Sequence, residues 1–379
     1  MILVLANNTS ADSVEYRALI DRLNQLPGIK HRVHREVGTE VTLTEIYLIG
    51  NTRALVQETM EQLPCVKKII RISEPYRVLG HHQHGDDRAT SFDYNGVRFG
   101  QDTFHVFAGL CAVDSRESVE AMMKALQEHG QVCTRMGAYK PRTSPYAFQG
   151  YGQQCLPYIF ELAGKYGIRV IAMEITHESH VDEIRAALNA TGNATGVMLQ
   201  IGTRNTQNFE LLKLIGRQQE FPVLIKRGFG ITLDESLNAA EYLASEGNRK
   251  VVFCLRGMKT NMGDPHRNFV DFAHVPVLKR LTRMPVCVDP SHSVGTRDAS
   301  PDSILDIFHA VAQGIVAGAN MVLVDFHPFP EKALVDGPQA LRLHELRYFL
   351  DDTALVRETY LKRAALAAAA QKTRETQPS

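Results

Sequence analysis

Short apolar runs alternate with amphipathic stretches through most of the chain. Eight runs of strand length follow residue 104, at 104–110, 131–137, 169–175, 197–202, 222–228, 250–257, 285–293 and 321–328. Continuous apolar strands separated by helical stretches are typical of a parallel sheet covered by helices. Eight such units over roughly 250 residues predict a closed (β/α)₈ TIM barrel. An open doubly wound sheet is less favoured, because no strand is followed by GxGxxG.

The first 78 residues follow a different pattern and predict a small separate domain. Apolar runs at 2–6, 45–50 and 66–72 predict strands, and stretches at 10–26 and 53–63 predict helices, the first capped by Ser10 or Asp12. Two helices interleaved among strands indicate a ferredoxin-like α+β fold. Residues 79–103 are interpreted as a linker and a hairpin with its turn at Asn95-Gly96. The barrel is assigned to 104–362 and a C-terminal tail to 363–379.

Composition narrows the classes of partner. The 42 basic and 42 acidic residues balance, so neither nucleic acid nor an anionic membrane is an expected partner, and anion binding must come from local clusters. The chain contains no apolar run of membrane-spanning length, and its start lacks the features of a signal peptide. Its six cysteines show no CxxC spacing, so reduced thiols and a cytoplasmic protein are expected.

The carboxyl ends of barrel strands carry the chemistry in this fold, and here every strand end supplies a polar or thiol group. The candidates are Cys111, Arg135, Lys140, Arg142, Glu174, Arg204, Lys226, Arg227, Arg256, Asp289, His292, Asp325 and Asp336. The arginines and lysines among them suit phosphate and carboxylate groups. This pattern therefore predicts a polyanionic ligand, and more specifically a phosphorylated one.

Four of these candidates form a second chemical group. Cys111, His292, Asp325 and Asp336 follow strands that become neighbours when the barrel closes. One thiolate, one imidazole and two carboxylates suit a borderline divalent ion such as Mn²⁺, Fe²⁺, Co²⁺ or Zn²⁺. The alternative for Asp325 and Asp336 is a strand that simply turns polar where it reaches water.

Several motifs resemble one known family. They are AGLC (108–111), RMGAYKPRTSPYAFQG (135–150), LQIGTRNTQNF (199–209), VDPSHSVGTRD (288–298) and HPFPEKALVDGPQAL (327–341). These segments resemble 3-deoxy-D-arabino-heptulosonate-7-phosphate (DAHP) synthase, in the form that carries an N-terminal ferredoxin-like domain. KPRTSPYAFQG and DPSHS are the most specific of these motifs. The similarity extends over nearly the whole chain.

The resemblance implies a metal-dependent condensation of phosphoenolpyruvate with erythrose 4-phosphate, the first step of the shikimate pathway. It implies that phosphoenolpyruvate is held by Arg135, Lys140, Arg204, Lys226 and Arg256, and that the sugar phosphate meets Arg142, Thr143 and Ser144. Cys111, His292, Asp325 and Asp336 fall on its metal positions. Lys140 is the candidate for proton delivery and Glu174 for ordering the attacking water.

The resemblance also implies that the N-terminal domain binds an aromatic amino acid inhibitor and that the chain forms a homo-oligomer, either a tetramer or a dimer. The alternative for this domain is a subunit-contact module. Removal of this domain should therefore abolish inhibition without abolishing synthesis.

The sequence departs from the family pattern near the predicted metal. Leu110 and Ala112 flank the thiol where the family has Pro and Ser, Thr296 replaces an Arg, and Asp325 replaces a Glu. Three alternatives therefore stay open. The enzyme could use another aldose phosphate, it could be a Schiff-base aldolase using Lys226 or Lys140, or the protein could be a catalytically impaired sensor of phosphosugar or aromatic amino acid.

Overall fold

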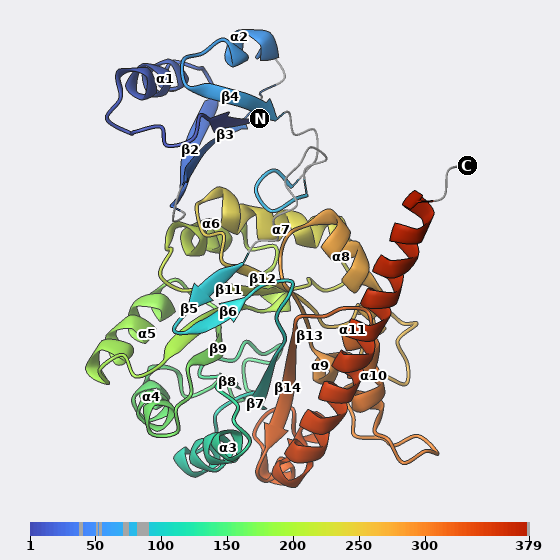
Figure 1. The fold of residues 1–379 in the computed structure, drawn as a ribbon. Helices are drawn as coiled ribbons and strands as arrows, with labels where there is room; N and C mark the ends of the chain where they lie inside the picture. Colours follow the sequence, from blue (N-terminus) through green and yellow to red (C-terminus); the bar gives the residue numbers. More distant parts are fainter. Residues whose placement is uncertain (38–40, 51, 53–54, 71–75, 82–90, 377–379) are drawn as a thin grey trace. The chain divides into compact units, whose positions relative to one another are not determined.

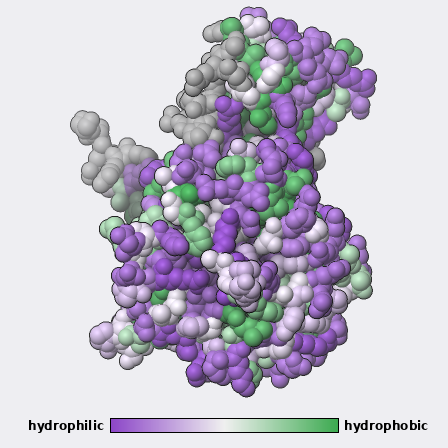
Figure 2. Space-filling view, turned by 180° about the vertical axis from the view of Figure 1, so that it is seen from behind, coloured by the Kyte–Doolittle hydropathy of each residue, from purple (hydrophilic) through white to green (hydrophobic). Residues whose placement is uncertain are grey.

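The computed structural model describes the chain except for residues 38–40, 51, 53–54, 71–75, 82–90 and 377–379. The chain forms two compact units, residues 1–87 and 88–379. Residues 82–90 of the linker predicted at 79–103 lie outside the described residues. No helix in the described ranges has the length and apolar character needed to cross a membrane. On the face of the second unit seen in Figure 2, hydrophobic residues are scattered among hydrophilic ones.

The first unit is an antiparallel sheet with its helices on one face (Figure 1). Its elements are β1 (Ile2–Leu5), α1 (Val14–Asn24), β2 (Ile29–Val37), β3 (Thr42–Gly50), α2 (Gln57–Glu61) and β4 (Val66–Ile70). The strand order β2-β3-β1-β4 confirms the predicted ferredoxin-like fold. Its core joins alternate residues of the inner strands, such as Leu3 and Ile46, to Leu19 and Leu23 of α1.

Two local predictions in this unit were wrong. The pattern does not predict β2, because only Ile29, Val33 and Val37 are apolar in a segment otherwise filled by polar and charged residues. Such a composition fits its position at the sheet edge, where charged side chains discourage pairing with another chain. The cap of α1 is Ser13, whose hydroxyl accepts a hydrogen bond from the Tyr16 N–H, rather than Ser10 or Asp12.

The second unit contains a closed parallel barrel, as predicted. Its strands are β7 (His105–Leu110), β8 (Cys133–Met136), β9 (Val170–Ile175), β10 (Gly196–Ile201), β11 (Val223–Lys226), β12 (Val251–Leu255), β13 (Val286–Val288) and β14 (Met321–His327). Consecutive strands pair in parallel, β14 also pairs with β7, and the ring is therefore complete. The short strand β15 (Leu341–Arg342) adds to the edge of β14.

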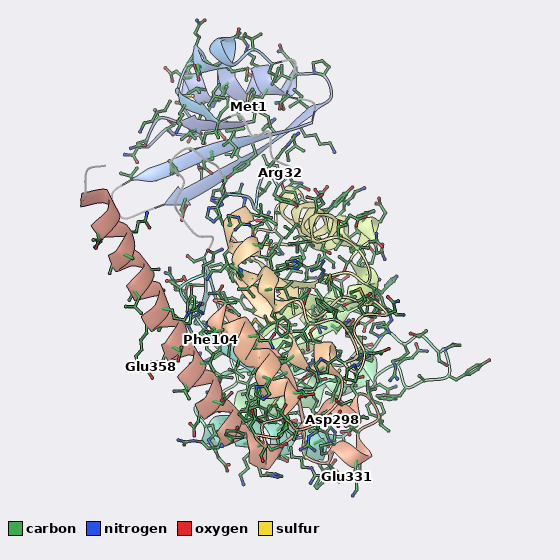
Figure 3. All side chains as sticks on the ribbon, turned by 90° about the vertical axis from the view of Figure 1, so that its right-hand side faces the viewer. Met1, Arg32, Phe104, Asp298, Glu331 and Glu358 are labelled. Carbon is green, nitrogen blue, oxygen red and sulfur yellow. The ribbon has the colours of Figure 1, made fainter. Side chains whose placement is uncertain are left out.

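Helices cover the outside of this barrel (Figure 1). They are α3 (Arg116–Glu128), α4 (Leu156–Lys165), α5 (Ser179–Ala190), α6 (Phe209–Arg217), α7 (Leu233–Ser245), α8 (Val275–Leu281), α10 (Asp306–Val316) and α11 (Leu346–Thr376). Helix α11 continues without a break through residue 363, where the tail was predicted to start. In Figure 3 it carries Glu358 and lies close to Phe104, whose ring is 5.4 Å from the Arg357 guanidinium.

The strand predicted at 285–293 is too long. Strand β13 ends at Val288, and a single helical turn, α9 (Pro290–Val294), follows it. The carboxylate of Asp289 accepts a hydrogen bond from the His292 N–H at 3.0 Å and so caps this turn. Pro290 at the first helical position favours the same change of direction. The turn directs His292 back over the end of the barrel.

A hairpin packs into the amino-terminal end of the barrel. It consists of β5 (Phe92–Tyr94) and β6 (Val97–Phe99), and its turn residues Asn95 and Gly96 have φ angles of 47° and 76°. Positive φ angles at both positions are the signature of the two-residue turn that an Asn-Gly pair predicts. Val97 and Phe99 belong to the same core cluster as the barrel strands. This end is thereby filled, which leaves the opposite end for ligands.

Candidate functional site

A layer of polar residues lies directly above the apolar core of the barrel. The core contains Phe107, Cys133, Ala172, Met198, Leu224, Cys254, Cys287 and Leu323, one from each strand. Two positions further along each strand stand Gly109, Arg135, Glu174, Gln200, Lys226, Arg256, Asp289 and Asp325. Because residues two apart point to the same face of a strand, these side chains enter the interior at the carboxyl ends. Figure 3 places Asp298 and Glu331, which follow β13 and β14, at this end.

The charges of this layer are buried and only partly paired. Arg135 forms an ion pair with Asp325, and Lys226 lies 2.6 Å from Asp289. A buried charge is costly unless it is paired and hydrogen-bonded, so these pairs account for four of the charged side chains. Arg256, 3% exposed, has no such pair among the described residues.

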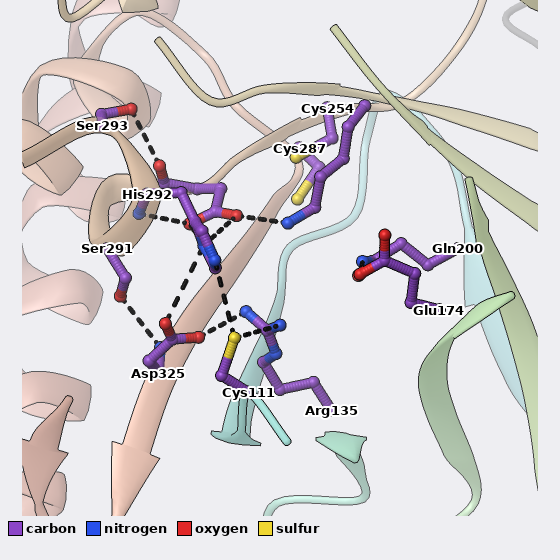
Figure 4. A network of polar contacts seen from close by, with 12 residues as sticks. Cys111, Arg135, Glu174, Gln200, Cys254, Cys287, Ser291, His292, Ser293 and Asp325 are labelled. Atoms are coloured by element: carbon purple, nitrogen blue, oxygen red, sulfur yellow. Dashed lines mark hydrogen bonds and ion pairs between the residues drawn. The ribbon is translucent and has the colours of Figure 1, made fainter. Parts of the chain in front are cut away.

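Four metal-ligating side chains meet at one side of this layer. Figure 4 shows three of them, Cys111, His292 and Asp325. One donor atom each from Cys111, His292, Asp325 and Asp336 falls within 4.8 Å of the others. Cys111 Sγ is 3.0 Å from Asp336 Oδ2 and 3.6 Å from His292 Nε2. His292 Nε2 is 3.5 Å from Asp336 Oδ2. The sequence-predicted metal set therefore comes together in space, and these spacings fit one small ion.

Asp289 orients the imidazole of His292. Its carboxylate lies 2.9 Å from His292 Nδ1, which leaves Nε2 directed at Cys111 and Asp336. A histidine that donates one ring N–H to a carboxylate presents the other nitrogen as a metal ligand. Burial alone would raise the pKa of Asp289, but the charges of His292 and Lys226 hold that pKa well below its usual range.

Asp336 reaches the site from the loop after β14 and has a left-handed backbone, with φ at 56°. Its Oδ1 accepts a hydrogen bond from Arg267 at 3.0 Å, and its Oδ2 is 3.3 Å from Lys140 Nζ. Burial would raise the pKa of this carboxyl, yet His292 and Lys140 bring the pKa far below its ordinary value. Asp336 therefore stays ionised, as a metal ligand must.

Lys140 connects the metal-ligating side chains to the cationic pocket. Its Nζ lies 2.7 Å from Cys111 Sγ and 3.3 Å from Asp336 Oδ2. Burial lowers the pKa of such an amine, but the neighbouring Cys111 and Asp336 raise the pKa of Lys140 above its ordinary value. The lysine is therefore held as a charged proton donor beside the thiol.

Asp325 differs from the other three candidate ligands. One of its oxygens pairs with Arg135 and the other accepts a hydrogen bond from Gln339 Nε2. Its Oδ2 is 3.9 Å from His292 Nδ1, the ring nitrogen that faces away from Cys111. One oxygen of Asp325 is therefore occupied by a cation and the other by an amide donor.

A pocket of about 300 Å³ opens beside the four candidate metal-ligating side chains. Its lining includes the predicted residues Lys140, Arg142, Thr143, Ser144, Glu174, Arg204, Lys226, Arg256, His292 and Asp336. Cys111, Arg135 and Asp325 are not part of the lining. Cys111 Sγ lies between two cations, 2.7 Å from Lys140 Nζ and 3.3 Å from Arg135 Nη2. Arg227 does not face the pocket, because it pairs with Asp271 at 3.0 Å and also contacts His274.

Arg256 is a buried cation with unsatisfied donors. Its Nε and Nη1 have no hydrogen-bond partner, and burial lowers the pKa of the guanidinium. Buried polar groups are nearly always paired, so unsatisfied donors at a pocket wall indicate a site for an acceptor. An anionic ligand would satisfy them.

Sequence reasoning missed the roles of several neighbours. Gln339 and Asp289 stand inside the quoted motifs, and the DPSHS segment could have indicated that Asp289 supports His292. Arg267 and Phe229 lie in loops without a pattern of their own. Their roles depend on loop geometry, which strand periodicity does not reveal.

Fold and site together define a class: a (β/α)₈ barrel with a pocket lined by cations beside a cluster of side chains that could hold a metal ion, preceded by a ferredoxin-like domain. The chain belongs to the DAHP synthetase I family, which matches residues 79–359, and residues 1–74 match the DAHP synthase ferredoxin-like domain. The resemblance inferred from the motifs is thereby confirmed.

Relatives and solved structures agree with this family. The chain is 39% identical over 310 residues to phospho-2-dehydro-3-deoxyheptonate aldolase of Thermotoga maritima, covering 82% of this chain and 85% of that protein. It is 28% identical over 287 residues to 2-dehydro-3-deoxyphosphooctonate aldolase of Syntrophobacter fumaroxidans, covering 71% and 94%. A crystal structure of the Thermotoga maritima DAHP synthase superposes with a TM-score of 0.67 at 32% identity, covering 94% and 96%.

Proposed function

We propose that this protein condenses phosphoenolpyruvate with erythrose 4-phosphate to give DAHP and inorganic phosphate. The observation that carries the proposal is the pairing of a buried, unsatisfied arginine, Arg256, with a metal-ligating cluster in one pocket. The first feature suits a phosphate and the second suits activation of a carbonyl group. Membership of the DAHP synthetase I family supports the same reaction.

In this proposal one set of cations binds the phosphate of phosphoenolpyruvate and another set binds its carboxylate. Arg204, Lys226 and Arg256 hold its phosphate, because Arg256 has free donors and Arg204 is exposed beside it. Arg135 and Lys140 hold the carboxylate next to the metal-ligating residues. Arg142, Thr143 and Ser144 line the outer part of the pocket and take the phosphate of the sugar. The contact between Arg204 Nη2 and Thr143 Oγ1, at 3.2 Å, connects the two subsites.

Cys111, His292, Asp325 and Asp336 are proposed to hold a divalent ion. A thiolate and an imidazole with two carboxylates suit Mn²⁺, Fe²⁺, Co²⁺ or Zn²⁺ better than Ca²⁺ or Mg²⁺. The orientation of His292 by Asp289 supports this assignment. When bound, such an ion acts as a Lewis acid that makes the aldehyde carbonyl more electrophilic.

The reaction requires a proton donor and an ordered water. C3 of phosphoenolpyruvate attacks the aldehyde carbon, and cationic character develops at C2. Water adds at C2, and phosphate then leaves with cleavage of its C–O bond. Lys140 delivers a proton near the new hydroxyl, since its ammonium lies between Cys111 and Asp336. Glu174 orders the water. Its Oε2 accepts a hydrogen bond from Gln200 at 3.3 Å, and the carboxylate faces the pocket.

Lys140→Met tests the proton-delivery role. The variant should bind phosphoenolpyruvate and lose turnover, measured by calorimetry and by phosphate release respectively. Full turnover with intact binding would show that Lys140 does not deliver the proton. Lys165→Met, which changes an exposed lysine on α4, is the matched control.

We further propose that the ferredoxin-like domain binds an aromatic amino acid as an inhibitor and that the chain forms a homo-oligomer. The match of residues 1–74 to the DAHP synthase ferredoxin-like domain supports the regulatory role. Light scattering of the full chain tests the assembly, and a monomeric mass would contradict it. Deleting the domain tests whether it holds the inhibitor.

A second candidate acceptor is another aldose phosphate. The similarity to 2-dehydro-3-deoxyphosphooctonate aldolases, together with Asp325 and Thr296 in place of the usual family residues, favours this alternative. Phosphate release with phosphoenolpyruvate and a panel of aldoses, with and without chelator, distinguishes the two. Fastest release with erythrose 4-phosphate supports DAHP synthesis. No release with any aldehyde would refute both.

A further inference from the structure

Three cationic side chains gather around the ring of Phe229, a pocket residue in the loop after β11. The guanidinium carbon of Arg256 lies 4.9 Å from the ring centroid, and that of Arg204 lies 5.4 Å away. Lys259 Nζ is 5.7 Å from the same centroid. The three cations come from loops after β10 and β12, so Phe229 is the side chain that all of them share.

In the part of the chain that the structure describes, these cations have no carboxylate partner, in contrast to three other cations at this end of the barrel. Lys140, Lys226 and Arg135 pair with Asp336, Asp289 and Asp325. Among the described residues, no carboxylate forms an ion pair with Arg204, Arg256 or Lys259. Arg256 also keeps two donor nitrogens without a hydrogen bond. The pocket therefore has a neutralised half near the metal-ligating residues and an uncompensated half around Phe229.

An uncompensated group of like charges must be held together by something else before a ligand arrives. The charges repel one another, and two of the side chains, Arg204 and Lys259, are exposed and could turn toward water. The face of an aromatic ring carries a partial negative charge and attracts cations within about 6 Å. The loop suits this role, because Gly230, with φ at 60°, makes a tight turn directly after Phe229.

We propose that Phe229 is a positioning residue that holds Arg204, Arg256 and Lys259 in place for the phosphate of the substrate. This inference rests on the proposed function, in which this half of the pocket takes the phosphate of phosphoenolpyruvate. A carboxylate in the place of Phe229 would compete with that phosphate. The ring attracts the cations without offering a hydrogen-bond acceptor, so the donors of Arg256 stay free for the ligand.

A fluorinated series at Phe229 separates the ring electrostatics from its shape. Replacement by mono-, di- and trifluorophenylalanine reduces the negative charge on the ring face while the side chain keeps nearly the same volume. The KM for phosphoenolpyruvate should rise with each fluorine, by about tenfold over the series. The kcat should change less than twofold, because the ring does not touch reacting atoms. A KM that stays flat across the series would overturn the proposal.

Substitutions by standard amino acids provide the second test. Phe229→Leu should raise the KM for phosphoenolpyruvate by a similar factor. Phe229→Tyr keeps the ring face, so its KM should stay close to that of the unsubstituted protein. Phe209→Leu changes an aromatic residue on α6 outside the pocket and should leave the KM unchanged. A KM close to the unsubstituted value in both the Leu and the Tyr variant would indicate a packing role and contradict the proposal.

Binding of inorganic phosphate, measured by calorimetry on the full chain, keeps this inference distinct from the proposed reaction. If the protein binds phosphate with an affinity that falls along the fluorinated series but forms no DAHP, the positioning role stands and the proposed function fails. If DAHP forms and the affinity for phosphate stays the same in all the fluorinated variants, the proposed function stands and the role of Phe229 fails.

Discussion

Arg135 and Asp325 form an ion pair inside the barrel, with side chains 3% and 0% exposed. They stand at the same level on the two strands that flank β7, because Asp325 and Arg135 are both in register with Gly109. Glycine places no side chain between them. A Cβ there would approach the carbonyl oxygen of Arg135 to 2.1 Å, so the pairing depends on glycine at this position.

Asp325→Ala should destabilise the protein strongly. The substitution leaves a buried guanidinium without its counter-ion, which typically costs about 3–5 kcal/mol of folding free energy. Urea unfolding in the presence of chelator measures this loss without any contribution from a bound metal. Asp351→Ala removes the partner of Arg347 on the surface of α11 and should have no measurable effect. Equal stability of the two variants would contradict the assignment of a structural ion pair.

Asp325→Glu should tighten metal binding. Asp325 Oδ2 lies 3.9 Å from His292 Nδ1, on the far side of the imidazole from Cys111 and Asp336. One more methylene would extend the carboxylate toward the side that Nε2 faces. Competition with a chromophoric chelator for Zn²⁺ or Mn²⁺ measures the affinity independently of activity. A weaker affinity would mean that the site has adapted to the shorter side chain. Raised DAHP synthesis with the raised affinity would identify a weakened form of the family site.

Arg256→Met should stabilise the protein without ligand while weakening phosphoenolpyruvate binding. Arg256 is buried and lacks both a carboxylate partner and two hydrogen bonds, and an apolar side chain of similar length removes that cost. The expected gain in the free energy of unfolding is about 1–3 kcal/mol, measured by urea titration.

Arg227→Met is the matched control for that substitution. Arg227 is also buried and lies next to Lys226, but it is paired with Asp271 at 3.0 Å. Its loss should destabilise the protein by about 3 kcal/mol, since Asp271 is then left as an unpaired buried charge. A loss of stability in both variants would indicate that Arg256 has a structural partner of its own.

The alternation of apolar runs with amphipathic stretches was sufficient to predict the barrel. Parallel strands buried on both faces appear as continuous apolar runs, and all eight were located in the sequence. Strand β2 was missed because an edge strand with only three apolar residues in nine resembles neither a buried strand nor a loop. The end of β13 was misplaced because Asp289 caps a helical turn, which depends on a single side-chain contact.

The sequence predicted which polar residues lie together at this end of the barrel, but it did not predict which of them pair with one another. Strand ends identified Arg135, Lys226 and Arg256 together, yet Arg135 and Lys226 are neutralised by aspartates and Arg256 is not. That difference depends on which strands stand next to each other and on loop conformation. The contribution of Phe229 was missed for the same reason, since a single Phe in a loop has no periodic signature.

Deletion of residues 1–87 should leave DAHP synthesis intact and remove inhibition by Tyr or Phe. The second unit has a closed sheet, its own core and a hairpin that fills the amino-terminal end, so we expect residues 88–379 to fold by themselves. The metal-ligating cluster and the pocket also consist entirely of residues from the second unit. Phosphate release with and without each amino acid, on the full chain and on residues 88–379, measures both effects. A truncated protein that is still inhibited would exclude the first unit as the inhibitor site, whereas one that folds but makes no DAHP would show that this unit is required for catalysis.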